Sequence, residues 1–163
     1  MNSKTKENFD FENRMNKYMQ TYYESNGFDV VWESDVLKDV ILIKNGEETK
    51  VEHKYRRFES AHQYDDILIE IIQDVKDKSM GRLYTSGADI LNYIICLKTQ
   101  HGEKPDRFYA FYLSEFKNWF YNYIETNQIK YITSKDGYGV TINISVPIKD
   151  IPKDSFFWER HLE

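Results

Sequence analysis

The pair Asn45-Gly46, which lies between two runs of strand-forming residues, limits the fold of this 163-residue chain more than any other feature. Both residue types tolerate the positive φ angles of a two-residue type I′ turn, so the pair predicts a tight β-hairpin. Counting outward from such a turn along both strands places Asp39 opposite Glu52. Cross-strand partners point to the same face with Cβ atoms about 5 Å apart. The sequence therefore predicts two neighbouring carboxylates.

The tripeptide Glu52-His53-Lys54 adds a third functional group to that face. Because side chains alternate along a strand, Lys54 shares the face of Glu52 and the His53 side chain points to the opposite one. Two close carboxylates repel each other, and ligands that are all oxygen suit Mg²⁺ or Mn²⁺. A lysine beside such an ion can orient or deprotonate a water, as phosphodiester hydrolysis requires. The alternative is a charged hairpin edge that faces solvent, because acid-x-lysine is common in strands.

These residues resemble the motif of the PD-(D/E)xK nucleases, whose restriction-endonuclease-like fold includes phage nucleases and Holliday-junction resolvases. The family pattern is an acid at the start of one strand, a hairpin, and then (D/E)-x-K, here Asp39, Glu52 and Lys54. A second stretch, residues 65–94, resembles the strand-then-helix segment of phage-type members. Two positions depart from the pattern, since Lys38 replaces the motif's proline and His53 replaces the more usual aliphatic residue.

The resemblance implies a metal-dependent DNA nuclease of a phage or mobile element. Asp39 and Glu52 would bind Mg²⁺ or Mn²⁺ together with the backbone carbonyl of His53, and Lys54 would position the attacking water. Many resolvase-like members place a glutamate near the metal from the first helix, so Glu12 is a candidate fourth site residue, with a plain position beside the apolar stripe as the alternative. A homodimer would supply the two active sites that duplex cutting commonly needs.

The net charge of −5 argues against a general nucleic-acid binder. Residues 50–57, however, carry four positive charges and one negative charge next to the predicted site. Arg56 and Arg57 are therefore candidate substrate-binding residues, as is Gln73 at the end of an apolar run, and a solvated strand end is the alternative for the two arginines. The acidic charge and small size also suggest a second hypothesis. The chain would keep the nuclease fold without catalysis and bind a host protein as an anti-defence accessory or inhibitor.

A rival for the first ligand is Asp35, which lies about 13 Å along the strand direction from the residue that pairs with Glu52, so Asp39 is preferred. The run Ile67–Ile72 predicts a strand buried on both faces. A helix over residues 61–78 also fits this run, and the family resemblance favours the strand. Glu70 would then be an interior acid that needs a cation or a metal.

Several helices are predicted around these strands. The first begins between Thr5 and Asp10 and ends before Gly27, and its apolar stripe consists of Phe11, Met15, Tyr18, Met19 and Tyr22. The spacing Ser86-x-x-Asp89 is typical of a capping box and predicts a helix to Leu97, followed by a strand over residues 107–113 and a parallel crossover. Ser114 is predicted to cap an amphipathic core helix.

The whole chain, residues 1–163, is predicted to be one α/β domain with a restriction-endonuclease-like αβββαβ core. A mixed central sheet would be flanked by helices, and residues 129–146 would form a small C-terminal strand pair around Asp136-Gly137. The thirteen tyrosines are interpreted as edges of the core, or else as stacking surfaces for bases. The single cysteine, Cys96, should be buried. No signal peptide or long apolar run is evident, so a cytoplasmic protein without a membrane partner is expected.

Overall fold

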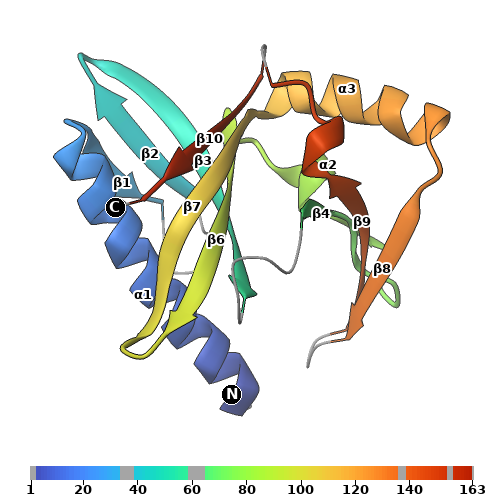
Figure 1. The fold of residues 1–163 in the computed structure, drawn as a ribbon, viewed down its shortest axis with the longest axis horizontal. Coiled ribbons are helices and arrows are strands. Elements are labelled where there is room, and N and C mark those ends of the chain that lie inside the picture. The colour runs from blue at the N-terminus through green and yellow to red at the C-terminus, as the bar shows by residue number, and fades with distance from the viewer. Residues whose placement is uncertain (1–2, 34–38, 59–64, 136–138, 154–155, 163) are drawn as a thin grey trace.

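The computed structural model describes residues 3–33, 39–58, 65–135, 139–153 and 156–162 (Figure 1). The described part is an α/β structure with a six-stranded sheet and a four-stranded sheet. In chain order its elements are α1 (Ser3–Ser25), β1 (Asp29–Trp32), β2 (Asp39–Lys44), β3 (Glu47–Phe58), β4 (Asp66–Asp74), β5 (Ser79–Met80), α2 (Arg82–Thr85), β6 (Ile90–Thr99), β7 (Gly102–Tyr112), α3 (Leu113–Thr126), β8 (Lys130–Lys135), β9 (Val140–Pro147), the 3-10 helix η1 (Ile148–Asp150) and β10 (Phe157–His161).

The predicted hairpin is confirmed in its turn and in its register. Asn45 and Gly46 have φ angles of 56° and 83°, which suits the type I′ turn. β2 and β3 pair antiparallel, and Asp39 lies opposite Glu52. β1 adds to the free edge of β2, so the hairpin lies inside the sheet rather than at its border.

The six-stranded sheet is mixed, with the order β1-β2-β3-β6-β7-β10. Its only parallel pair among the described strands is β3 with β6, and every other pair is antiparallel. Asp89 fixes the start of this parallel pair, because its backbone N–H donates to the Lys50 carbonyl and its Oδ2 accepts from the Lys50 N–H at 2.8 Å.

The helix predicted from Ser86 to Leu97 is wrong, because β6 occupies most of this segment. The Ser86 hydroxyl accepts a hydrogen bond from the Ala88 N–H in a loop, and Asp89 bonds β3 instead of capping a helix. Residues 91–96 are all buried. A strand covered on both faces has a continuous apolar run, which resembles the run of a buried helix.

β4 confirms the strand predicted for Ile67–Ile72, but its environment differs from the prediction. Ile67 and Ile69 are buried while their neighbours are only partly covered, so one face of β4 meets the core. β4 belongs to the four-stranded sheet of order β5-β4-β9-β8. The predicted parallel crossover from this strand to residues 107–113 is therefore wrong, since β7 pairs with β6 and β10.

α1 covers one face of the six-stranded sheet. Phe11, Met15 and Met19 are buried against Val40, Val51, Ile94 and Phe108, as the predicted stripe requires. The stripe was wrong at Tyr18, which is 52% exposed, and Tyr23 is buried in line with the three core residues. Gly27, just after the helix, has a φ of 80° that favours glycine, so the helix ends where the sequence predicted.

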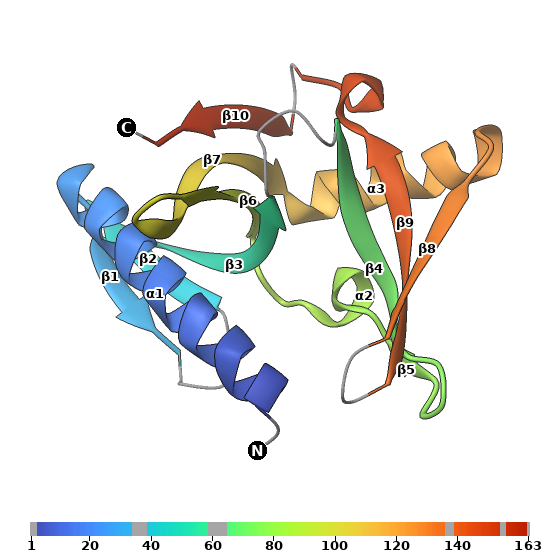
Figure 2. The same cartoon turned by 60° about the horizontal axis from the view of Figure 1, so that its bottom comes forward.

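The opposite face of the six-stranded sheet packs against the second sheet and α3 (Figure 2). The predicted core helix is confirmed as α3, whose Phe116, Phe120 and Tyr123 are buried. The predicted cap is wrong, because the helix already begins at Leu113 and Ser114 lies within its first turn. The predicted C-terminal strand pair is also confirmed as β8 and β9, although β9 in addition pairs with β4, and the predicted turn at Asp136-Gly137 lies outside the described residues. β10 was not predicted and forms the edge of the larger sheet beside β7. Cys96 is buried, as expected.

Candidate functional site

Asp39 and Glu52 form a buried pair of acids at the face of the six-stranded sheet that is turned away from α1. Each residue is 5% exposed. Asp39 is the first residue of β2, and Glu52 lies at the middle of β3. The hairpin register brings them together, as the sequence predicted. Two buried carboxylates that lie opposite each other on paired strands require a positive charge nearby.

Arg82 supplies that charge. Its Nε donates to Glu52 Oε1 at 2.8 Å, and its Nη2 donates to Asp39 Oδ1 at 3.2 Å. Sequence reasoning missed Arg82, which belongs to no motif and lies thirty positions from Glu52. The only available signal was the electrostatic need of the two acids for a cation.

Glycine at position 81 allows Arg82 to come so close. A Cβ at Gly81 would lie 2.2 Å from the Glu70 carbonyl oxygen, which is far inside van der Waals contact. The Gly81 N–H donates to the Ile71 carbonyl at 3.0 Å, so the one-turn α2 lies directly on β4. Any larger residue would push α2, and Arg82 with it, away from the carboxylates.

Glu70 and Lys54 form the second half of the site. Lys54 Nζ lies 3.7 Å from Glu70 Oε2, and Glu70 Oε1 accepts the Arg82 backbone N–H at 3.3 Å. The prediction that Glu70 needs a cationic partner is confirmed by this ion pair. A hollow of about 20 Å³ is lined by Glu52, Lys54, Glu70 and Arg82, and its other walls are aliphatic. That volume is close to the space one water requires.

A further cation, Lys50, approaches Asp39 from the other side. Its Nζ lies 2.6 Å from Glu33 Oε2 and 3.7 Å from Asp39 Oδ2. Burial and the charge of Glu52 raise the pKa of Asp39, while Arg82 and Lys50 lower it only in part. The folded protein therefore disfavours the ionised form of Asp39 even with both cations nearby.

His53 confirms the predicted alternation, because its ring points to the α1 side and is buried. The Asn92 side-chain amide donates to the Tyr23 hydroxyl at 2.6 Å, so this hydroxyl donates to His53 Nε2 at 2.8 Å. His53 Nδ1 then carries the proton and donates to the Tyr55 hydroxyl at 3.1 Å, which in turn donates to Asn16. This chain of hydrogen bonds joins β3 to α1 and holds the strand that carries Glu52 and Lys54.

Of the other predicted site residues, Glu12 and Arg57 lie on the α1 side, and Arg56 is paired with Asp66. Glu12 is on α1, which packs against the sheet face that carries His53 and not the face of Glu52. The Arg56 guanidinium is bonded to Asp66, at 2.8 Å from Oδ1. Arg57 lies 3.7 Å over the ring of Phe11, again on the α1 side.

Two candidates remain to be placed. Gln73 is exposed near the end of β4, beyond Glu70. Asp35, the rival first ligand, falls outside the described residues. The cluster itself thus combines three predicted residues, Asp39, Glu52 and Lys54, with Glu70 and Arg82.

In the described part of the chain, no three His, Cys, Asp or Glu side chains converge as metal ligands. Asp39 and Glu52 are nevertheless hard oxygen donors side by side, which is the donor chemistry that Mg²⁺ and Mn²⁺ prefer. Arg82 now bonds both of them. The residues fit a divalent ion on the condition that the guanidinium releases the carboxylates.

Comparisons with protein-family models, with curated proteins and with solved structures find no match to this chain. Among the described helices, none combines the length and the apolar character needed to cross a membrane. The functional interpretation therefore depends on the geometry of the site.

Proposed function

We propose that this protein is a metal-dependent DNA nuclease that hydrolyses phosphodiester bonds. The observation behind the proposal is the register that sets Asp39 opposite Glu52 while Lys54, on the same face of β3, pairs with Glu70. The strand order β1-β2-β3-β6 with a parallel β3 and β6 supports a restriction-endonuclease-like core. The connection between these two strands runs through β4, β5 and α2 instead of a full helix, which is a departure from the αβββαβ pattern.

Asp39 and Glu52 would hold the Mg²⁺ or Mn²⁺ ion, with the His53 carbonyl as the third protein ligand. The ion would supply Lewis-acid stabilisation of the phosphate and a more acidic water. Lys54 orients the attacking water through its ammonium, and Glu70 keeps that ammonium in place from 3.7 Å. Arg82, once released from the carboxylates, binds the phosphate oxygens through the same planar fork of donors.

The second candidate function is a nuclease-like fold that binds a host protein without catalysis. Arg82 favours this alternative, because a guanidinium that bridges both acids can neutralise them permanently. The two functions differ in one property that is simple to measure. A nuclease binds Mn²⁺ at Asp39 and Glu52, whereas a binding protein with a fixed Arg82 does not.

The test is a cleavage assay on plasmid, linear, single-stranded and branched DNA with Mg²⁺ or Mn²⁺. Wild-type protein should cut at least one of these substrates, and EDTA should stop the reaction. Lys54→Ala should reduce the rate by about 10² or more, because the ammonium that orients the attacking water is lost, while calorimetric Mn²⁺ binding persists because the ammonium is not a ligand. Lys130→Ala, at an exposed position of β8, is the matched control.

Each result separates the two functions. Metal binding without cleavage of any substrate would contradict the nuclease. Absence of both Mn²⁺ binding and cleavage would favour the host-protein alternative, which pull-down experiments with the wild-type protein could then pursue.

A further inference from the structure

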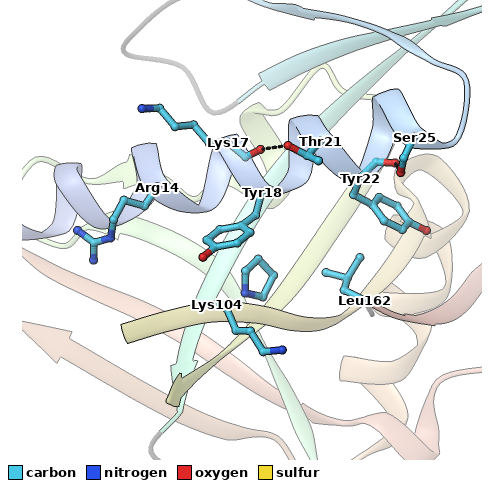
Figure 3. Close-up of a pocket in the computed structure, with 9 residues that line it drawn as sticks. Arg14, Lys17, Tyr18, Thr21, Tyr22, Ser25, Lys104 and Leu162 are labelled. Atoms are coloured by element: carbon cyan, nitrogen blue, oxygen red, sulfur yellow. Dashed lines mark hydrogen bonds between the residues drawn. The ribbon is translucent and has the colours of Figure 1, made fainter. Parts of the chain in front are cut away.

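A second surface of interest lies on the α1 side of the molecule. An open groove of about 710 Å³ runs between α1, the early part of β7 and Leu162, which follows β10 (Figure 3). Tyr18 extends from α1 toward Lys104 of β7, and Arg14 lies one turn earlier on the same helix. This groove is separated from Asp39 and Glu52 by the six-stranded sheet, because α1 covers the opposite face.

The groove is basic in a chain whose net charge is −5. Its described lining residues include the cations Arg14, Lys17 and Lys104, and none of them is an acid. Among the described residues, neither lysine forms an ion pair, and Arg14 forms a single exposed one, at 3.5 Å from Glu103. An exposed pair of this kind contributes little, so a phosphate can compete for the guanidinium.

A neighbouring hollow extends the positive surface. It shares Arg14 and Tyr18 with the groove and adds Arg57 and Lys98, together with the acids Glu7 and Glu103. Arg57 contacts both acids, at 3.7 Å and 3.4 Å. Among the described residues, the two hollows therefore contain five Arg and Lys side chains against two acids. The excess of positive charge suits a polyanion that follows the helix.

Tyr18 determines which polyanion fits. The residue is 52% exposed although it lies on a helix that packs against the core, and its ring points over the groove toward Lys104 (Figure 3). An accessible aromatic ring between cations is the arrangement with which proteins bind single strands, since a base stacks on the ring and the flanking phosphates bind the cations. The bases of a duplex are already stacked on each other, so a duplex cannot use Tyr18 in this way.

We propose that this groove binds single-stranded nucleic acid, with a base stacked on Tyr18 and phosphates bound by Arg14, Lys17 and Lys104. The binding site requires no metal and makes no use of Asp39 or Glu52. It therefore stands or fails separately from the nuclease activity.

The test is fluorescence anisotropy of a short labelled oligothymidylate in EDTA, which keeps any metal-dependent cleavage out of the measurement. For three phosphate contacts, the logarithm of the affinity should fall with the logarithm of the salt concentration with a slope of about −2. The double variant Arg14→Glu/Lys104→Glu should weaken binding by about tenfold or more and flatten this slope. The control Lys130→Glu/Lys135→Glu makes the same charge change on exposed positions of β8 and should bind as the wild type does.

The stacking contact is tested with Tyr18→Ala, which should weaken binding about fivefold or more, the lower end of what one stacked base contributes. Tyr131→Ala is the matched control, because Tyr131 is a tyrosine that is 63% exposed on β8. Circular dichroism checks that all variants fold. No binding, equal losses in variants and controls, or equal competition by polyglutamate or duplex DNA would each overturn the proposal.

Discussion

The hydrogen bonds around His53 predict an acid-sensitive stability. Burial lowers the pKa of His53 from 6.5 to about 3, so the folded protein keeps this imidazole neutral. Its Nε2 accepts from Tyr23, and a proton placed there would meet a donor and break the bond. The folded state thus favours neutral His53 at neutral pH, and this contribution is lost as the pH falls below 6.5 toward the folded pKa.

The magnitude follows from the two pKa values. Between pH 7 and pH 5 the unfolded chain takes up most of one proton at position 53 while the folded protein takes up almost none, which costs about 2 kcal/mol of unfolding free energy. His53→Gln removes the imidazole and with it this dependence. The substitution also disturbs packing, but the packing cost is the same at each pH and cancels from the comparison.

The assay is urea unfolding of both proteins at pH 7, 6 and 5. The free energy of unfolding of the wild type should fall by about 2 kcal/mol more than that of His53→Gln over this range. His161→Gln removes an exposed imidazole and should follow the wild type. A constant difference between wild type and His53→Gln at the three pH values would refute the buried neutral histidine, and with it the orientation of the hydrogen bonds that join β3 to α1.

Three further predictions concern the acid pair. Arg82→Gln should bind Mn²⁺ about tenfold or more tightly than the wild type in calorimetry, because the competing cation is gone; an equal or weaker affinity would mean that the guanidinium does not occupy the metal position. Mn²⁺ at a hundredfold excess over its dissociation constant should stabilise the wild type by about 2.7 kcal/mol and Glu52→Gln very little; equal shifts in thermal melts would exclude Glu52 as a ligand. Because the pKa of Asp39 is raised above 3.8 in the folded protein, the stability that this carboxyl contributes is fully present below pH 3.8. It is lost as the pH rises through the folded pKa. Metal-free Asp39→Asn should therefore gain stability relative to the wild type as the pH rises from acid to neutral, as measured by chemical denaturation.

Local chemistry alone determined the centre of this protein. Asn45 and Gly46 accept positive φ angles, so the turn, the register and the meeting of Asp39 with Glu52 followed from counting residues. The period of two along β3 likewise placed Lys54 beside Glu52 and turned His53 to the other face. Each of these relations spans a few residues or one hairpin, where backbone geometry leaves few alternatives.

Tertiary structure decided everything that depends on which segments pack together. The apolar segment that contains Cys96 fits either a buried helix or a buried strand, and only its position between β3 and β7 makes it β6. Arg82 contacts the acids because Gly81 allows α2 to pack closely on β4, and no local sequence pattern predicts this contact. The same holds for Tyr18, which periodicity assigned to the core and packing left at a groove. Periodicity shows that a residue lies on the apolar face of its own helix or strand, whereas its burial depends on which distant segment covers that face.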